Sequence, residues 1–260
     1  LVVDPAGEWR EAEFTATDLV VADPDRLCGH LSQLVRSGGS AEWRNRWTRA
    51  ESAHSEAVAE RRDTLFEGGI LADVVEGLPD PATLVVSNSM PVRDLDRFGG
   101  ADTTSVTTIG NRGASGIDGI VSTALGAAAG TTDDVTLVIG DLAYYHDMNG
   151  LAAIRRAEVD ATVVLLNNDG GGIFHMLPIE RFEPPFTSQF KTPHGLDFEP
   201  TGELYGLDYR QVDSRAGFRE AYAEAVAAAG SQVIEVQTDA AASHDVRDAL
   251  QRETVDRLVD

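Results

Sequence analysis

Six short apolar runs separated by helix-type segments constrain the fold of residues 81–260 most strongly. Helix-patterned stretches lie between several of them, at 117–129, 148–157 and 216–229. Nearly continuous apolar strands that alternate with helices are typical of a parallel sheet covered on both faces. The sequence therefore predicts a doubly wound α/β fold, in which a ligand binds at the carboxyl ends of the strands. The six runs are residues 83–87, 105–110, 135–140, 161–167, 207–212 and 232–238.

The first 80 residues follow a different pattern. A short strand is expected at 14–21 and a helix from Asp25, and the SGGS segment at 37–40 interrupts them. We interpret residues 1–40 as the remnant of a preceding domain, residues 41–80 as a helical connection, and residues 81–260 as the main domain. Because the sequence opens at Leu1 rather than at Met, we expect a truncated or processed product that lacks an N-terminal half.

The charge is strongly one-sided, with 43 acidic residues against 21 lysines and arginines and a formal net charge of −22. Such a field repels nucleic acid and anionic membranes, so neither is expected as a partner. Lys191 is the only lysine, and excess acid with scarce lysine is typical of halophilic proteins. No apolar run approaches the roughly 18 residues of a membrane helix, so a cytoplasmic protein is expected. The single cysteine, Cys28, is expected to be a buried, unreactive thiol.

A glycine and an aspartate end the third apolar run of the main domain. Gly140 allows the backbone to approach a phosphate closely, and Asp141 is a hard oxygen ligand of the kind that Mg²⁺ prefers. Aspartates at strand ends are common in α/β proteins of every function. On its own, this pair is weak evidence for a metal site.

The next apolar run ends in LLNNDGGGIF, which places Asn168 27 positions after Asp141. That distance accommodates one helix and one strand, so both side chains are expected at the same edge of the sheet. A carboxylate, an amide oxygen and a glycine carbonyl, assigned here to Gly170, would supply three oxygen ligands for Mg²⁺ or Mn²⁺. An asparagine-glycine turn between strand and helix is the alternative interpretation of NNDGGG.

GD followed at this separation by NN resembles the signature of thiamine-diphosphate enzymes. The resemblance implies that Asp141, Asn168 and the carbonyl of Gly170 hold the metal ion. It also implies that Ile117 supports the bent thiamine, although an isoleucine there could equally be helix core. The residues it assigns to the lining of the diphosphate are Gly140, Leu142 and Ala143.

Further motifs narrow the resemblance. SNSMPVRDLDRF at 87–98, NRGASGIDG at 111–119 and FKTPHGLDFEP at 190–200 resemble the 2-succinyl-5-enolpyruvyl-6-hydroxy-3-cyclohexene-1-carboxylate synthases of menaquinone biosynthesis. The similarity covers only the C-terminal portion of that family, from the end of its central domain onward. It assigns a substrate-binding or catalytic role to Ser89, Arg93, Arg112, Ile173, Phe174 and Leu177.

The arginines would bind the carboxylates of 2-oxoglutarate and isochorismate, and the three apolar residues would keep water from the reacting carbon. The alternatives are a surface ion pair with an acid such as Asp94 for the arginines and a helix cap for Ser89. For Ile173, Phe174 and Leu177, the alternative is a short helix packed on the sheet.

The family reaction decarboxylates 2-oxoglutarate and adds the resulting succinyl carbanion equivalent to isochorismate. The activating glutamate comes from an N-terminal pyrimidine-binding domain of the same or another subunit, so this chain alone is expected to be inactive. A homo-oligomer, by analogy a dimer, is expected for the full-length protein. The open alternatives are another thiamine-diphosphate enzyme, of the acetohydroxyacid synthase or keto-acid decarboxylase type, and a non-catalytic cofactor-binding or assembly domain.

Overall fold

The computed structural model describes residues 1–9, 11–36, 39–100 and 104–259 in two compact units, Leu1–Arg49 and Ala50–Asp260. Residues 37 and 38 of the SGGS segment lie outside the described residues. The boundary between the units falls within helix α2 (Ala41–Glu60). Among the described residues, no helix combines the length and the apolar character needed to cross a membrane.

The first unit contains two short parallel strands, β1 (Val2–Val3) and β2 (Leu19–Val20), and helix α1 (Pro24–Leu34). The helix begins where Asp23 accepts a hydrogen bond from the amide of Arg26, and Pro24 occupies the first helical position. The predicted helix is confirmed, whereas the predicted strand at 14–21 is limited to Leu19–Val20. The expectation of a buried Cys28 is wrong: its thiol is exposed, because α1 buries none of its residues.

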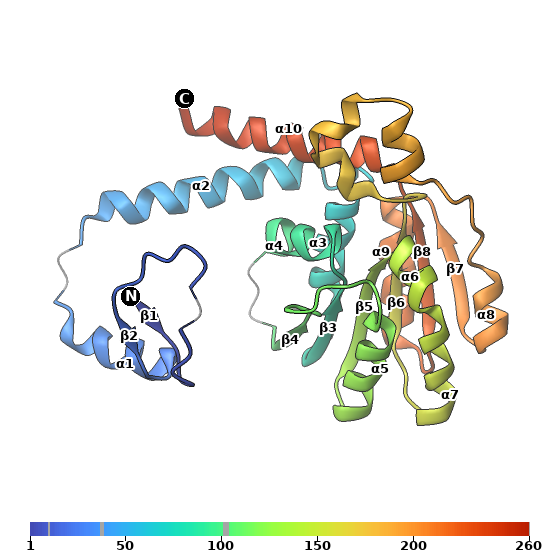
Figure 1. Ribbon diagram of the computed structural model, residues 1–260, viewed down its shortest axis with the longest axis horizontal. Coiled ribbons are helices and arrows are strands. Elements are labelled where there is room, and N and C mark those ends of the chain that lie inside the picture. Colours follow the sequence, from blue (N-terminus) through green and yellow to red (C-terminus); the bar gives the residue numbers. More distant parts are fainter. Residues whose placement is uncertain (10, 37–38, 101–103, 260) are drawn as a thin grey trace. The chain divides into compact units, whose positions relative to one another are not determined.

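The second unit is built on a six-stranded parallel sheet in the order β4-β3-β5-β6-β8-β7, which confirms the predicted fold class (Figure 1). All six predicted strands are present, and their ends shift only slightly. The chain leaves β3 toward one edge and leaves β5 toward the other, so the order of the strands reverses between them. The strands are β3 (Ala82–Val86), β4 (Val106–Ile109), β5 (Asp134–Gly140), β6 (Thr162–Asn167), β7 (Asp208–Val212) and β8 (Gln232–Gln237).

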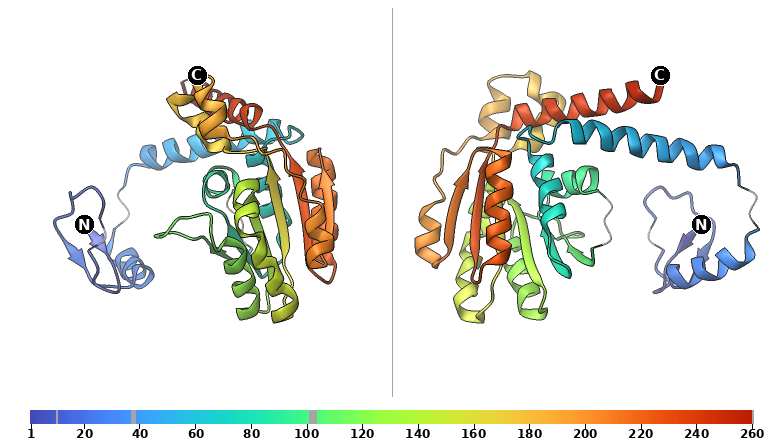
Figure 2. Two further views of the ribbon diagram at one scale, coloured as in Figure 1. Left: turned by 45° about the vertical axis from the view of Figure 1, so that its right-hand side comes forward. Right: turned by 180° about the vertical axis from the view of Figure 1, so that it is seen from behind.

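Helices cover both faces of this sheet (Figure 2). Because side chains alternate along a strand, Leu137 and Ile139 of β5 enter the core on one face, while Val138 enters the core on the other. The first face packs against α5 (Ile120–Gly130), α6 (Asp141–Asp147) and α7 (Ala153–Ala157). The second packs against α3 (Glu67–Gly77), α4 (Met90–Phe98) and α9 (Arg215–Ala227).

Short helical turns and two further helices complete the unit. The connection from β6 contains η2 (Gly172–Met176), η3 (Pro178–Arg181) and η4 (Phe186–Lys191) before α8 (Pro200–Tyr205). The stretch predicted as one helix at 148–157 is divided into η1 (Met148–Ala152) and α7. The helix expected from Ile117 begins only at Ile120, because Gly119 has a left-handed backbone with φ of 71°. The last helix, α10 (Ala240–Val259), has no counterpart in the prediction.

Two buried groups of charged side chains join helices of the second unit to one another. Arg215 of α9 donates to both carboxylate oxygens of Asp73 on α3, at 2.6 and 2.9 Å. Arg247 of α10 donates to Glu67 on α3, at 2.6 Å, and to Asp94 on α4. Buried charges of this kind are stable only when they are paired.

Candidate functional site at the carboxyl ends of the strands

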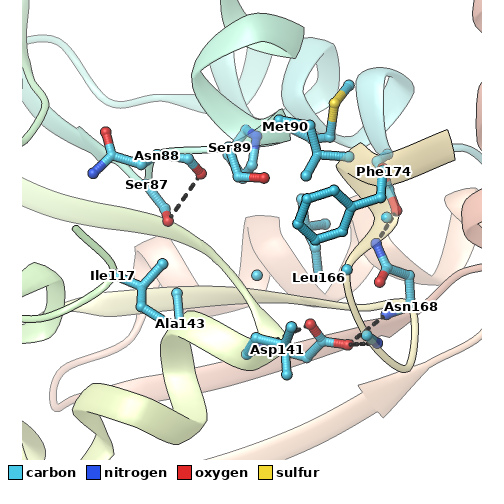
Figure 3. A pocket seen from close by; sticks show the side chains of 18 residues that line it. Ser87, Asn88, Ser89, Met90, Ile117, Asp141, Ala143, Leu166, Asn168 and Phe174 are labelled. Carbon is cyan, nitrogen blue, oxygen red and sulfur yellow. Dashed lines mark hydrogen bonds between the residues drawn. The ribbon is translucent and has the colours of Figure 1, made fainter. Parts of the chain in front are cut away.

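A cavity of about 260 Å³ opens at the carboxyl ends of β3, β5 and β6, beside the point where the strand order reverses. This is the place where open α/β sheets bind their ligands. Figure 3 shows Ser87, Asn88 and Ser89 on one wall, with Asp141 and Asn168 on another. Ten of the predicted site residues line the cavity: Ser89, Ile117, Gly140, Asp141, Leu142, Ala143, Asn168, Gly170, Ile173 and Phe174.

Asp141 is one of two buried acids that line the cavity, with 2% of its surface exposed. Its Oδ1 accepts a hydrogen bond from the amide of Leu142 at 2.6 Å. Its Oδ2 accepts bonds from the amides of Asn168 at 3.2 Å and Gly170 at 2.9 Å. Burial raises the pKa of Asp141, and the hydrogen bonds that favour its charged form oppose this increase. The backbone after β6 is therefore tied directly to the acid after β5.

Asn168 presents a buried oxygen without a partner. Its Nδ2 donates to Oε1 of Glu67 at 2.6 Å. Its Oδ1 and Nε2 of His175 are the two buried side-chain atoms, among the described residues, that have no hydrogen-bond partner. Such a group is costly unless something binds it, so the oxygen is suited to a ligand.

Two glycines allow close approach of the backbone at this site. A Cβ atom on Gly140 would meet no other atom within 4 Å, so this side of the cavity is open to a ligand. A Cβ on Gly170 would lie 2.1 Å from the carbonyl oxygen of Lys191, and the φ of Gly170 is 134°. Only glycine adopts this conformation readily in the space available, and it folds the loop back over Asp141.

Two polar side chains that were not predicted from the sequence, His194 and Glu67, hold the loop in place. His194 donates from Nε2 to Oδ2 of Asp141 at 3.2 Å, while its Nδ1 accepts the amide of Leu196 at 3.0 Å. The segment 190–200 is one of the family-like motifs, so a signal for His194 existed. Glu67 carried no such signal, because its partner Asn168 lies 101 positions away.

Apolar side chains form the remaining walls. Phe174 packs edge-on against Phe190, with ring centroids 5.5 Å apart, which fixes its ring beside the cavity. Ile117 is 37% exposed and lines the cavity, so it is not the helix-core residue of the alternative interpretation. Ser89 has a φ of 72° and makes no side-chain cap to α4, which removes the simplest structural role for its hydroxyl.

Three described residues among the predicted site residues lie outside the cavity lining: Arg93, Arg112 and Leu177. Arg93 donates to the carbonyl of Ser89 at 2.6 Å, and Arg112 donates to Oδ1 of Asn88 at 3.3 Å. Both guanidinium groups therefore touch residues that line the cavity, and both side chains are exposed.

The ion pair with Asp94 proposed as their alternative role is absent, because Asp94 is buried against Arg247. Leu177 is 46% exposed.

The oxygen atoms at the cavity suit a metal ion that is also coordinated by a bound phosphate group. The described residues contain no group of three or more His, Cys, Asp or Glu side chains that could hold a metal by themselves. The cavity instead offers two buried carboxylates, Asp141 and Glu67, and one unpartnered amide oxygen beside an open glycine. Mg²⁺ is typically bound by one or two carboxylates, with phosphate and water oxygens completing its shell. The residues present fit such an ion together with a diphosphate.

Together, the sheet and its glycine-lined cavity define a cofactor-binding α/β domain. The sequence matches the family described as "Thiamine pyrophosphate enzyme, C-terminal TPP binding domain" over residues 102–236. The chain belongs to this family of thiamine pyrophosphate enzymes.

Curated relatives extend the similarity to almost the whole chain. Two proteins named "2-succinyl-5-enolpyruvyl-6-hydroxy-3-cyclohexene-1-carboxylate synthase" are 58% identical (Halorubrum lacusprofundi) and 59% identical (Haloarcula marismortui). Each match covers 99% of this chain, and 45% and 43% of the respective relative. A protein of the same name from Roseiflexus castenholzii is 46% identical over 95% of this chain and 43% of its own. The resemblance inferred from the motifs is confirmed, and the chain spans less than half the length of these relatives.

Solved structures agree on the fold. The thiamine diphosphate-dependent 4-hydroxybenzoylformate decarboxylase of Rhodococcus jostii is 25% identical, with a TM-score of 0.54 over 67% of this chain and 33% of its own. The benzoylformate decarboxylase of Polynucleobacter necessarius is 23% identical, also with a TM-score of 0.54, over 68% of this chain and 34% of its own. The second likeness concerns the fold alone.

Proposed function

We propose that this chain is the diphosphate- and metal-binding part of a 2-succinyl-5-enolpyruvyl-6-hydroxy-3-cyclohexene-1-carboxylate synthase. The full-length protein decarboxylates 2-oxoglutarate and adds the succinyl unit to isochorismate. One observation carries the proposal: the buried Oδ1 of Asn168 has no partner in the cavity that also contains Asp141. The identity to synthases of that name supports the choice of substrates.

In this proposal Asp141, Asn168 and the carbonyl of Gly170 hold Mg²⁺ or Mn²⁺, while Gly140, Leu142 and Ala143 line the diphosphate. When bound, thiamine diphosphate supplies a carbon nucleophile that also accepts the electrons released by decarboxylation. The protein positions that group and excludes water. Ile117 lies where it can support the cofactor, and Ile173 and Phe174 form an apolar wall.

The substrates of the proposed reaction are polyanions, and the exposed arginines fit them. Arg93 and Arg112 bind the carboxylates of 2-oxoglutarate and isochorismate, for which a planar guanidinium offers two parallel donors. Their contacts with Ser89 and Asn88 keep both groups close to the cavity. Ser89 donates from the cavity wall, and Leu177 adds an exposed apolar side chain close in sequence to Ile173 and Phe174.

Activity further requires an N-terminal pyrimidine-binding domain, of the same or another subunit, that supplies the activating glutamate. We propose that the full-length protein is a homodimer in the cytoplasm of a salt-adapted organism. The net charge of −22 and the sources of the first two relatives described above support the salt adaptation.

Thermal melting in molar KCl, with and without thiamine diphosphate and Mg²⁺, tests the cofactor site. A ligand present at a hundredfold excess over its Kd stabilises the folded state by about 2.7 kcal/mol. For a domain of this size, that corresponds to a rise in Tm of roughly 5–10 °C. In the longer full-length protein we expect a smaller but measurable rise, which is lost in Asp141→Ala. No shift in the wild-type protein would contradict the proposed site.

The choice of acceptor tests the reaction. Full-length protein supplied with 2-oxoglutarate is expected to form product only when isochorismate is present. Condensation of pyruvate with itself would instead indicate an acetohydroxyacid synthase, and release of a free aldehyde would indicate a keto-acid decarboxylase. Cofactor binding without turnover of any of these substrates would indicate a non-catalytic domain.

A further inference from the structure

We propose that Glu67 is a positioning residue that orients the amide of Asn168 so that its oxygen, rather than its nitrogen, faces the metal ion. This inference rests on the proposed function, since it concerns the same metal site. Glu67 is the first residue of α3 and lies far along the sequence from the glycine-rich segments that contain the proposed ligands. It does not bind the ion in this proposal and acts only through Asn168.

The contact between the two side chains is short and buried. Oε1 of Glu67 accepts Nδ2 of Asn168 at 2.6 Å, and Glu67 is 2% exposed. A turned amide would place two acceptor oxygens, Oδ1 of Asn168 and Oε1 of Glu67, against each other. Because a hydrogen bond to a charged acceptor is about twice as strong as a neutral one, the carboxylate selects a single amide orientation. The selected orientation leaves Oδ1 as the unpartnered atom.

Other side chains hold the Glu67 carboxylate in place. Oε2 accepts Nη2 of Arg247 at 2.6 Å, and the hydroxyl of Thr238 donates to Oε1 at 3.3 Å. Glu67 also begins an 11-residue helix, whose amino end favours a negative charge. Arg247 makes its remaining charged contacts with Asp94. Glu67 is therefore held by Arg247 and Thr238 while Oε1 remains directed at Asn168.

Pairing with Arg247 does not by itself explain a second acid here. Two buried carboxylates, Glu67 and Asp94, share one guanidinium, and burying a charge is costly until it is compensated. Asp94 already accepts from two nitrogen atoms of Arg247. The additional function that distinguishes Glu67 from Asp94 is its bond to the amide of the proposed ligand. Partners that orient metal ligands in this way typically change metal affinity by about 10–100-fold when they are replaced.

Glu67→Gln in the full-length protein tests the proposal, because glutamine is isosteric and can face an amide in either orientation. Mn²⁺ is titrated in the presence of saturating thiamine diphosphate in molar KCl, and free Mn²⁺ is followed by its electron paramagnetic resonance signal. We expect Glu67→Gln to weaken Mn²⁺ binding by about 10–100-fold. Asp94→Asn is the matched control, since it removes the other carboxylate from Arg247 without touching Asn168. Its Mn²⁺ affinity should remain within about twofold of wild type.

An exchange of donor and acceptor provides the decisive second test. In an Asn168→Asp background two carboxylates face each other, so Glu67→Gln should restore a donor and strengthen Mn²⁺ binding. The same substitution thus weakens binding in the wild-type background and strengthens it in the Asn168→Asp background. A purely structural role of Glu67 toward Arg247 would give the same direction in both backgrounds.

The possible results separate the inference from the proposed function. Wild-type protein that binds no Mn²⁺ with thiamine diphosphate would overturn both. Normal wild-type binding that is unchanged in Glu67→Gln, or weakened equally in Asp94→Asn, would overturn the role of Glu67 alone. If Glu67→Gln by itself does not fold, the double variant decides: a folded double variant that binds Mn²⁺ supports the pairing, and an unfolded one refutes it.

Discussion

Replacing Gly170 by alanine introduces a methyl group into a loop that has no space for it. The new Cβ would lie 2.1 Å from the carbonyl oxygen of Lys191, which is itself fixed by a 2.7 Å hydrogen bond from the amide of Gly171. Relieving the clash therefore costs that bond or moves the loop, at about 1–3 kcal/mol. The φ of 134° adds strain of about 1–3 kcal/mol for a residue with a side chain.

The lower ends of these ranges add up to about 2 kcal/mol. For a domain of this size, this lowers Tm by at least roughly 4–8 °C. The assay is thermal unfolding of the full chain, followed by circular dichroism in molar KCl without cofactor. Gly140→Ala is the matched control, because its φ of −81° suits alanine and its Cβ would meet nothing within 4 Å. Equal melting temperatures for Gly170→Ala and Gly140→Ala would refute this reasoning.

Three further predictions follow from the site and the core. Gly140→Ala is expected to reduce the affinity for thiamine diphosphate at least about tenfold without lowering Tm, since the methyl group fills the open side of the cavity. An unchanged affinity, measured by calorimetry, would contradict this prediction. Asp73→Asn should lower the free energy of unfolding, measured by urea titration, by about 3 kcal/mol, because it leaves Arg215 buried without a charged partner. Asp63→Asn, the control, removes the exposed acid that pairs with Arg219 and should change the free energy of unfolding little. Burial raises the pKa of Tyr222 to about 12 from its ordinary value of 10.0. The stability that depends on the protonated hydroxyl is therefore fully present below pH 10 and is lost as the pH rises from about 10 to about 12. Across that range, the midpoint of urea unfolding should decline less in Tyr222→Phe than in the wild-type protein.

The sheet was predictable because its strands are buried on both faces and therefore appear as continuous apolar runs. β5 and β6 are examples, with nearly every residue buried. The proximity of Asp141 and Asn168 was predictable for the same reason, since each follows one of two neighbouring parallel strands in the sheet. Strand ends and glycine-rich turns are local features, so one sequence is sufficient to find them.

Other features could not be predicted from the sequence, because they depend on contacts between residues that lie far apart along the chain. Helix α10 buries Ala240, Ser243, Arg247 and Leu250 on one face. Since two of these are polar, the apolar periodicity that normally reveals a helix is weak. Arg247 is buried only because Glu67 and Asp94, 180 and 153 positions away, neutralise it. Cys28 was misjudged for the opposite reason, because an apolar pattern existed but the first unit provides no core for it.

The order of strands has a consequence for how the chain can be divided. The segment that matches the family, residues 102–236, begins after β3 and ends before α10. β3 lies between β4 and β5, so a polypeptide cut at those limits would separate β4 from the rest of its sheet. It would also lack the helices that carry Glu67 and Arg247. The region that matches the family, residues 102–236, is therefore shorter than the smallest piece we expect to fold, and gene fragments intended for expression should begin before Ala50.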